Sequence, residues 1–232
     1  MSLNSKYTVK PINKEQIKEW LLKKHYAKRI PSIIYSFGLY LQNDLIGVCT
    51  YGIPPQNNCL LMCGEEYKSK AIELNRLIKE DNLDKNLQSW FVSKTFKYLP
   101  KPIIVLSYSD PNNYHYGYTY QALNFLYTGE GGASKEYIYN NRQYSMRHIK
   151  EKWFKNKNLH FDSNLNIDEN FINIGGEIVY LKKKHRYIIF LGSKKQKKQM
   201  LKKLIWKVSP YPKGDNRKYN TDYKTNTQTT IF

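Results

Sequence analysis

Two short polar motifs contain the residue types that can activate a weak nucleophile. His25 and Tyr26 stand at the end of a predicted helix, and Ser107 and Asp110 lie where an apolar run ends. His115, at the start of a further predicted helix, could approach Asp110, and a carboxylate near an imidazole can take a proton from a weak nucleophile or bind a divalent metal. Asp110 could equally form a turn with Pro111, and His25 could simply interact with the helix dipole. Both motifs are therefore candidate sites, each with a structural alternative left open.

A third motif lies on a predicted strand that reads Glu-Leu-Asn-Arg-Leu. Because side chains alternate along a strand, Glu73, Asn75 and Leu77 are expected on one face and Leu74 and Arg76 on the other. An ordinary half-exposed strand gives the same alternation, so the spacing alone does not establish a site.

The hydrophobic periodicity indicates the elements that must position these residues. Asn13, with Gln16 three residues later, can cap the first helix, and Gly129 is the expected stop of a later one. The predicted elements, in chain order, are a helix at 13–26, a hairpin at 37–51, a strand at 71–78, a helix from Asp84 or Asn86, a buried strand at 103–108, a helix at 115–127, a strand pair at 178–181 and 187–191, and a helix at 194–206.

Strands and helices alternate in this order, which favours an α/β (α+β) domain with a central mixed sheet flanked by helices. We expect a catalytic core over residues 1–155 and a basic extension over 156–215, formed by a strand pair and a helix packed on the core. Residues 216–232 are polar and are expected to form a flexible tail.

Basic charge is concentrated in the last third of the chain. The net charge is +19, and residues 182–207 contain eleven Lys or Arg and no Asp or Glu. An unrelieved basic surface attracts polyanions and repels itself without one, so a nucleic acid is the expected partner and a merely solvated surface the alternative. Tyrosines among these cations would suit base stacking. The predicted nucleic acid contacts are Arg29, Tyr116, Tyr120, Lys183, Lys184, Arg186, Lys194, Lys195, Lys197 and Lys198.

The composition argues against two other classes of protein. No apolar run approaches the length needed to span a bilayer, and the N-terminus has no signal core, so we expect a cytoplasmic protein without a membrane partner. The three cysteines, Cys49, Cys59 and Cys63, are too few for a disulfide framework or a zinc site. Their role and the oligomeric state stay open.

Taken in order along the chain, the motifs resemble the phage Mom-type DNA modification proteins. The resemblance runs from about residue 15 to about residue 215. It is carried by His25-Tyr26, residues 73–77, residues 107–110, residues 117–129, His185-Arg186-Tyr187, residues 192–197 and residues 210–213.

This resemblance implies a fold similar to the GCN5-related acyltransferases (GNAT). It implies transfer of a carbamoylmethyl-type group to the exocyclic N6 of adenine in phage DNA within a bacterial host, which protects that DNA from restriction endonucleases. Tyr127 falls near the position of the general acid tyrosine of such acyltransferases. The donor is left open between acetyl-CoA and a glycine-derived molecule, and divalent iron is a candidate metal on His25, Tyr26 and Asp110.

The chain departs from ordinary acyltransferases at the turn that holds the coenzyme A pyrophosphate. Residues 81–89 contain no glycine, although close approach of backbone to a pyrophosphate usually needs one. Lys85, Asn86 and Ser89 could still hold an anion at a helix N-terminus. These residues, with Asn75 and Arg76, are the candidate cofactor contacts.

The adenine amine is buried in a duplex, so the base must be flipped out or presented as a single strand. Asp110 is the candidate base or orienting group, assisted by His25, Tyr26 and Ser107, with the rings of Tyr26, Tyr116 and Tyr120 available for stacking. We expect the basic C-terminal segment to grip the strand beside this pocket. The alternatives are a non-catalytic protein that masks DNA, and a coenzyme A-dependent acyltransferase that acts on RNA or protein.

Overall fold

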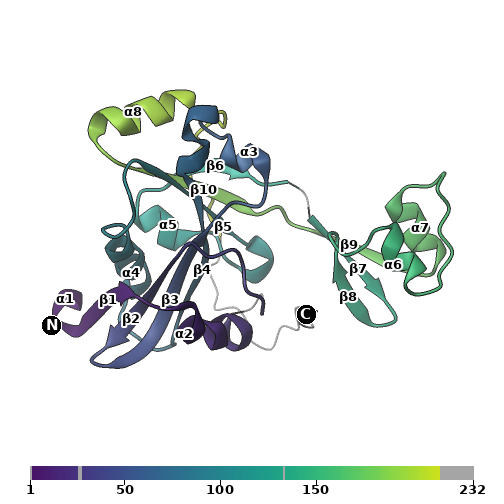
Figure 1. Cartoon of the computed structure of the whole chain (residues 1–232), viewed down its shortest axis with the longest axis horizontal. Helices are drawn as coiled ribbons and strands as arrows, with labels where there is room; N and C mark the ends of the chain where they lie inside the picture. The colour runs from purple at the N-terminus through teal and green to yellow at the C-terminus, as the bar shows by residue number, and fades with distance from the viewer. Residues whose placement is uncertain (1, 26–27, 133, 215–232) are drawn as a thin grey trace.

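The body of the protein is a seven-stranded mixed sheet (Figure 1). The structure is a computed structural model and describes residues 2–25, 28–132 and 134–214. The strand order is β1-β2-β3-β4-β5-β10-β6, with β4 and β5 parallel and the other neighbours antiparallel. The strands are β1 (Tyr7–Pro11), β2 (Tyr35–Leu41), β3 (Asp44–Gly52), β4 (Ala71–Lys79), β5 (Ile103–Ser109), β6 (Leu126–Glu130) and β10 (His185–Leu191). The predicted class, a central mixed sheet flanked by helices, is confirmed.

Helices cover both faces of this sheet because apolar side chains alternate across it. One cluster joins Leu87 and Phe91 of α4 to Leu74 and other strand residues, and a second joins Ile17 and Leu21 to Val48 and Ile78. The helices around the sheet are α1 (Leu3–Lys6), α2 (Lys14–Glu19), the π-helix η1 (Trp20–Lys24), α3 (Asn57–Leu60), the 3-10 helices η2 (Glu65–Lys70) and η3 (Pro111–Asn113), α4 (Leu87–Thr95), α5 (Tyr118–Ala122) and α8 (Lys194–Lys203).

A smaller unit, residues 134–181, is inserted between β6 and β10 and stands beside the body (Figure 1). We call it the inserted lobe. Its three-stranded sheet has the order β8-β7-β9, and a separate apolar cluster contains Tyr137, Ile149, Phe154 and Phe171. Its elements are β7 (Ser134–Tyr139), β8 (Arg142–Ser145), α6 (Glu151–Lys155), α7 (Ile167–Asn173) and β9 (Glu177–Leu181).

The predicted pairing of residues 178–181 with residues 187–191 is wrong. β9 pairs with β7 in the lobe, whereas β10 pairs with both β5 and β6 in the central sheet. The basic residues between these strands connect two sheets and do not form a hairpin turn. The expected boundary after residue 155 falls within the lobe, at the last residue of α6, and the expected flexible tail, 216–232, lies outside the described residues.

The predicted helix over residues 115–127 is much shorter than expected. It covers only Tyr118–Ala122, because Asn124 adopts a left-handed conformation (φ 58°) and the amide of Phe125 bonds to the Tyr120 carbonyl. Asn is one of the residues that tolerate this helix-ending conformation. Gly129, the expected stop signal, lies instead within β6.

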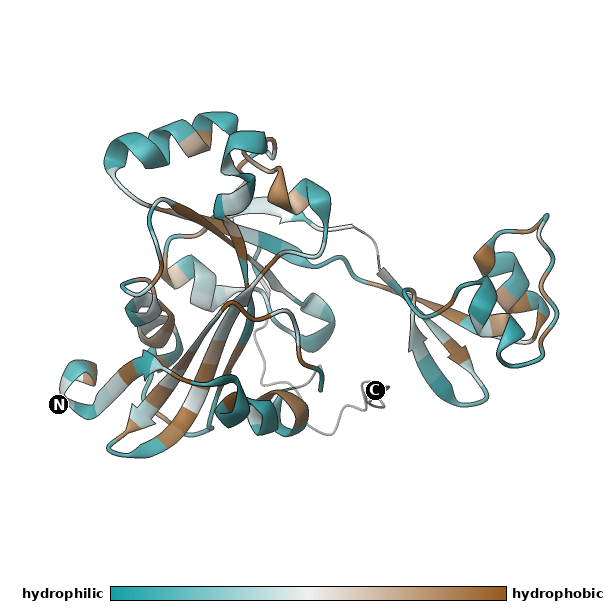
Figure 2. Cartoon of the chain, viewed as in Figure 1, coloured by the Kyte–Doolittle hydropathy of each residue, from teal (hydrophilic) through white to brown (hydrophobic). Residues whose placement is uncertain are grey.

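Several local predictions are confirmed. Asn13 and Gln16 form a capping box, the hairpin is β2–β3, and the buried strand is β5. Figure 2 shows the strongly hydrophilic α8, where Met200 is buried; Leu201, expected beside it in an apolar stripe, is 46% exposed. The three cysteines are buried and free. None of the helices described here is long and apolar enough to cross a membrane.

Candidate active site

The central sheet opens where β4 and β5 separate. These parallel strands pair at only three positions, from Ala71–Ile104 to Glu73–Leu106. Beyond them β5 continues to Ser109 and β4 to Lys79. Ligands of such sheets bind outside the carboxyl ends of the strands, so the residues that follow Glu73 and Leu106 border the natural site.

A β-bulge in β4 decides which side chains face this opening. Tyr51 pairs with Leu74 and Thr50 with Arg76, so Asn75 is an extra residue on β4. An extra residue resets the alternation of side chains. Leu74 and Leu77 accordingly pack in the same cluster, and the prediction that they lie on opposite faces is wrong.

Because of the bulge, Glu73 and Arg76 lie on one side of β4, opposite that cluster. Burial raises the pKa of Glu73, and the positive charges of Arg76, Lys184, Arg147 and Arg29 partly oppose this rise. A carboxyl group with a raised pKa is better suited to proton transfer near neutrality than an ordinary one. Glu73 is therefore a stronger candidate base than its motif alone indicated.

Asp110 lies directly after β5 and is only 8% exposed. Its Oδ1 accepts hydrogen bonds from the backbone and side-chain nitrogens of Asn112 at 3.0 and 2.8 Å, and its Oδ2 is 2.8 Å from Lys184 Nζ. Burial alone would raise the pKa of Asp110, but Lys184 and Asn112 outweigh it and hold the pKa below its usual value. Asp110 is therefore a fixed carboxylate, better suited to orienting groups than to taking a proton.

His25 follows the π-helix η1, and its backbone N–H donates to the Trp20 carbonyl at 3.0 Å. Its side chain is buried, and burial together with the charges of Arg76, His115, Lys184 and Arg29 lowers its pKa to about 2. The imidazole is thus neutral at physiological pH and can donate or accept a hydrogen bond. Tyr26, the adjacent candidate, lies outside the described residues.

His115 joins this cluster through the loop after β5. Its backbone N–H donates to the Asp110 carbonyl at 3.0 Å. Burial lowers the pKa of its imidazole, while the Asp110 carboxylate acts in the opposite direction. The site therefore combines two carboxyl groups in different protonation environments with two neutral imidazoles and the cations Arg76 and Lys184. Two carboxyl groups whose pKa values are shifted apart are typical of acid–base sites.

The described residues do not assemble a metal centre at His25 and Asp110. Within the part of the chain that the structure describes, no group of three or more His, Cys, Asp or Glu side chains could hold a metal ion. Both oxygens of Asp110 already have protein partners, and cationic side chains surround His25. These surroundings do not suit the candidate divalent iron, because the nearby positive charges repel a metal cation and Asp110 would have to give up its present partners to bind one.

The other two candidate catalytic residues, Ser107 and Tyr127, lie in different parts of the site region. Ser107 is fully buried, and its hydroxyl donates to the Leu74 carbonyl at 2.9 Å, which ties β5 to the bulge of β4. Tyr127 lies on β6, and its hydroxyl is 3.1 Å from His185 Nδ1. Ser107 therefore braces the site, whereas Tyr127 contacts His185, which lines a hollow next to the site.

The candidate cofactor contacts fall into two groups. Asn75 receives a hydrogen bond from Thr50 at 2.6 Å and donates to the Ser32 carbonyl at 2.8 Å, and Arg76 Nη1 donates to the Asn75 carbonyl. Both belong to the bulge at the site.

The second group lies at the far end of β4. Asn86 caps α4 in a left-handed conformation and its carbonyl accepts from the Ser89 hydroxyl at 3.0 Å, whereas Lys85 is exposed. Nearby, Asp84 accepts from Lys6 and Tyr7, each at 2.9 Å. The turn before α4 thus presents negatively charged carboxylates, and the Ser89 hydroxyl is already hydrogen-bonded to the backbone. A pyrophosphate, which is itself negatively charged, would bind poorly there.

A hollow of about 460 Å³ lies beside Asp110. A cavity of this size can hold a nucleobase-sized ligand. The ring of Tyr116 stands 5.8 Å from that of His185, and Tyr120 packs on Tyr187 at 5.3 Å. The residues that line the hollow are Pro111, Tyr116, Glu130, Leu181, Lys182, Lys183 and His185.

The predicted basic surface does not form one continuous wall beside the site. His185 pairs with Ser109 and Leu191 pairs with Ile103, so Lys183 and Lys184 lie at the site, whereas α8 begins at the opposite end of β10. The six steps between these ends span roughly 20 Å. The lysines at 194, 195, 197 and 198 are therefore remote from Asp110 at the start of the helix.

Arg186 and Arg29 also differ in their surroundings. Arg186 is half-buried, lies 3.6 Å from the centre of the Trp206 ring, and donates to Thr128 from both Nε and Nη2. These contacts hold β10, β6 and the segment after α8 together. Arg29 is exposed, and its charge acts on His25 and Glu73, so it borders the site.

Lys184 acts on the pKa of His25 and forms an ion pair with Asp110, so both of these predicted residues lie near the same lysine. The Glu73 motif and the approach of His115 to Asp110 are visible in the sequence, but the role of Lys184 as the ion-pair partner of Asp110 is not. The signal for Glu73 was present in its motif, but the bulge that turns it toward the opening has no marker in the local pattern. The partnership of Lys184 depends on the strand pairing of β10, which local periodicity does not encode.

A model described as the Mom protein family matches residues 6–213, which confirms the resemblance in the motifs. No curated protein sequence matches the chain. Among solved structures, the chain is similar to an N-acetyltransferase from Staphylococcus aureus Mu50 (11% identity, 79% of this chain and 98% of that chain, TM-score 0.43). It is also similar to Arabidopsis thaliana NAA60 in complex with acetyl-CoA (11%, 80% and 98%, TM-score 0.46) and to a GNAT family acetyltransferase from Elizabethkingia anophelis with acetyl-CoA bound (10%, 80% and 99%, TM-score 0.37).

Proposed function

Because this chain belongs to the Mom protein family, we propose that it is a transferase that attaches a small, carbamoylmethyl-type group to the N6 amine of adenine in DNA. The observation that supports this most is the cluster of Glu73, Asp110, His25 and His115 where β4 and β5 separate, in which Asp110 and His25 are buried and Glu73 and His115 are partly buried. The biological consequence would be protection of phage DNA from restriction endonucleases. The net charge of +19 suits a polyanionic substrate.

The reaction needs a proton acceptor, because the adenine amine must lose a proton as it forms its new bond. The N6 nitrogen bonds to the donor carbon, the bond between that carbon and its leaving group breaks, and the N6 proton passes to the Glu73 carboxylate. Burial raises the pKa of Glu73, so it holds a proton more readily than an ordinary carboxylate. A glycine-derived donor fits this step, since it can supply both the methylene carbon and the amide nitrogen, whereas acetyl-CoA would leave an acetyl group on N6 instead. The carboxylate-bearing turn before α4 also favours a donor without a pyrophosphate.

Asp110 and His25 serve this transfer by position. Asp110 remains charged and holds Lys184 and the loop that contains His115. His25 remains neutral, so its imidazole can hydrogen-bond to the edge of a base without adding charge. Both groups are less than a tenth exposed, so a base within a duplex cannot reach them. The target adenine must therefore leave the stack, and the hollow beside Tyr116 and His185 offers it space.

The test is mass spectrometry of nucleosides from DNA of phage-infected cells that express the protein. We expect an adenosine adduct heavier than deoxyadenosine, together with resistance of that DNA to restriction enzymes that cut at adenine-containing sites. Glu73→Gln should abolish the adduct and keep DNA binding. The matched control is Glu65→Gln, since Glu65 is exposed and pairs only with Lys68 among the described residues.

Three other outcomes would argue against this function. Protection from restriction without any adduct, unchanged by Glu73→Gln, would indicate a protein that masks DNA. Unmodified DNA together with acylated RNA or protein would indicate an acyltransferase with another substrate. Unmodified adenine with a folded protein, in infected cells that supply the donor pathway, contradicts the proposal.

A further inference from the structure

The inserted lobe is fastened to the loop that carries Asp110. The Asn112 side chain exchanges two hydrogen bonds with the backbone of Lys182, both at 2.9 Å. The backbone N–H of Gly131 donates to the Lys184 carbonyl at 2.7 Å, and Lys184 pairs with Asp110. Both connections of the lobe, before β7 and after β9, therefore start at the candidate active site.

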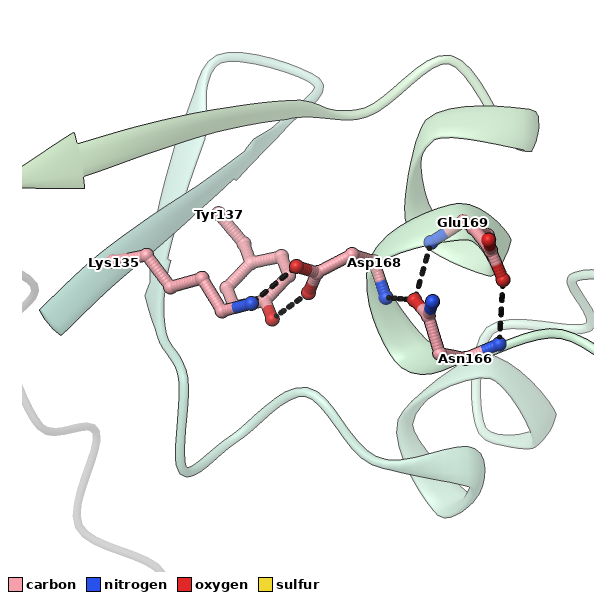
Figure 3. Close-up of polar contacts among 5 residues, drawn as sticks. All are labelled: Lys135, Tyr137, Asn166, Asp168 and Glu169. Carbon is pink, nitrogen blue, oxygen red and sulfur yellow. Dashed lines mark hydrogen bonds and ion pairs between the residues drawn. The ribbon is translucent and has the colours of Figure 1, made fainter. Parts of the chain in front are cut away.

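The acidic residues of α7 are used within the lobe, as Figure 3 shows. Asp168 accepts hydrogen bonds from Lys135 and from the Tyr137 hydroxyl, which fixes α7 to β7. Glu169 and Asn166 form a capping box at the start of α7. These carboxylates stabilise the lobe and leave the cations at its other end unneutralised.

The opposite part of the lobe is basic and exposed. Residues 137–150 contain no Asp or Glu. The segment from β8 to the start of α6, residues 142–150, carries Arg142, Arg147 and Lys150, all exposed. None of the three forms an ion pair with a described residue. Met146, beside Arg147, is 47% exposed, so this β8–α6 segment is open to solvent.

The carboxyl end of β8 lies close to the active site, whereas Arg142, at its amino end, pairs with Tyr139 at the end of β7 farther from the body. The same strand pairing places Ser145 opposite Glu136 on β7. Glu136 lies near enough to Asp110 and Lys184 for both charges to act on its pKa, which burial raises. Arg147, two residues after Ser145, acts in turn on Glu73. Arg147 thus lies near the site, as do Lys182 and Lys183, which line the hollow, and Arg142 extends the basic segment away from it.

We propose that the β8–α6 segment is a second nucleic-acid contact, in which Arg142, Arg147 and Lys150 bind phosphates of duplex DNA beside the extruded base. The body and the lobe would then hold the duplex from two sides. Charge complementarity supports this partner, since a duplex presents closely spaced phosphates and these three cations form no ion pair with any residue that the structure describes. The choice of DNA rests on the proposed function, whereas the position of the surface rests on the lobe itself.

The experiment compares two charge reversals of equal size in the full-length protein. The test variant is Arg142→Glu with Arg147→Glu; the control is Lys97→Glu with Lys101→Glu, two exposed lysines near the amino end of β5, away from Asp110. Binding to a fluorescent 20-base-pair duplex is measured at several salt concentrations. The test variant should bind about 10- to 100-fold more weakly and lose roughly two units of salt slope. Equal affinities of the two variants overturn the proposal.

A folding defect is separated from a contact by a milder variant. Arg142→Gln with Arg147→Gln removes charge without adding any, and circular dichroism and thermal melting establish that each variant is folded. It should show the same direction of effect with a smaller loss. A different outcome is that both arginine variants fold and bind duplex DNA as tightly as wild type, but bind single-stranded DNA or duplex RNA of the same sequence more weakly than wild type does. The segment would then contact RNA or single strands, and the proposal for duplex DNA would fail.

The nucleoside measurement keeps this inference separate from the proposed function. Wild-type protein that binds duplex DNA through these arginines but leaves adenine unmodified supports the surface and contradicts the transferase. Modified adenine with arginine variants that bind normally supports the transferase and removes the surface.

Discussion

Charged groups behave differently at the active site and on the inserted lobe. At the site, Asp110 is buried and paired with Lys184, and His25 is buried and neutral because burial and nearby positive charges lower its pKa. On the β8–α6 segment, Arg142 and Arg147 are exposed and form no ion pair with a described residue. Burying a charge is costly unless it is paired, so the first arrangement fixes protonation states. The second leaves positive charge available to a polyanion, and the two regions are thus suited to chemistry and to binding respectively.

After the loss of the proton acceptor in Glu73→Gln, the largest effect should come from Asp110→Asn. The change keeps a side chain of the same shape but removes the charge that holds Lys184, so the site loses its fixed carboxylate. We expect adduct formation to fall by about 100- to 10,000-fold, the range typical of groups that assist proton transfer. Adenosine adducts are measured by mass spectrometry, with DNA binding measured in parallel.

The matched control for this change is Asp168→Asn, in the lobe. Asp168 also pairs with a lysine and accepts a further hydrogen bond, but it lies against β7 and away from the chemistry. It should lower the stability of the lobe and leave adduct formation within a few-fold of wild type. Equal losses from the two variants would contradict the division between the regions.

The second effect concerns the independence of the lobe. Phe171 is fully buried in a cluster that shares no residue with the clusters of the central sheet. Phe171→Ala should cost about 3–5 kcal/mol, the usual range for removing a buried phenylalanine. Hydrogen exchange should then show amides of residues 134–181 opening while those of β4 and β5 stay protected. Simultaneous opening of both regions would show that they unfold as one unit.

The sequence predicts well the features that depend on neighbouring residues, and poorly those that depend on pairing between strands far apart in the sequence. The apolar run of β5 and the hairpin β2–β3 are readable because each depends on neighbouring residues, and so is the placement of Asp110 at a strand end. The bulge at Asn75 is not readable, because it is defined by pairing with β3. One inserted residue there places Glu73 and Arg76 on the same side, against simple alternation.

The lobe was missed for a related reason. Residues 178–181 and 187–191 look like a hairpin, since both are strand-like and a polar turn separates them. Their partners are β7 on one side and β5 and β6 on the other, far away in the sequence. The basic residues between them therefore connect the lobe to the active site. The same long-range pairing separates the basic residues of 182–207 into two groups: Lys183 and Lys184 lie at the site, and the lysines of α8 lie at the other end of β10.

The third effect is a pH dependence of stability that arises at the active site. The pKa of His25 is about 2 in the folded protein against an ordinary value of 6.5, so between these values the unfolded chain binds more protons. Stability is therefore greatest above about pH 6.5 and falls as the pH drops below it. His25 should contribute up to about 1.4 kcal/mol per pH unit, or roughly 2 kcal/mol between pH 6 and pH 4.5.

Urea unfolding at pH 6 and pH 4.5 checks this slope. Burial lowers the pKa of His115 and His185 as well, so the wild-type slope is shared among these residues. His25→Gln should remove the part due to His25, while His160→Gln, a change at an exposed residue of the lobe, should leave the slope unchanged. A slope that His25→Gln does not reduce would mean that the imidazole is charged or exposed in solution.

The smallest effect should come from the lysines of α8, which test whether exposed basic charge binds DNA wherever it occurs. Lys195 and Lys198 are exposed near the start of α8, at the end of β10 remote from Asp110. A duplex held between the body and the β8–α6 segment would reach them weakly, through long-range attraction that salt screens within about 10 Å. Lys195→Glu with Lys198→Glu should therefore weaken duplex binding by about two- to five-fold at physiological salt, clearly less than the reversal of Arg142 and Arg147. If the lysine variant loses more affinity for the duplex than the arginine variant does, the duplex lies along α8. Exposed cations would then bind DNA regardless of their distance from the active site.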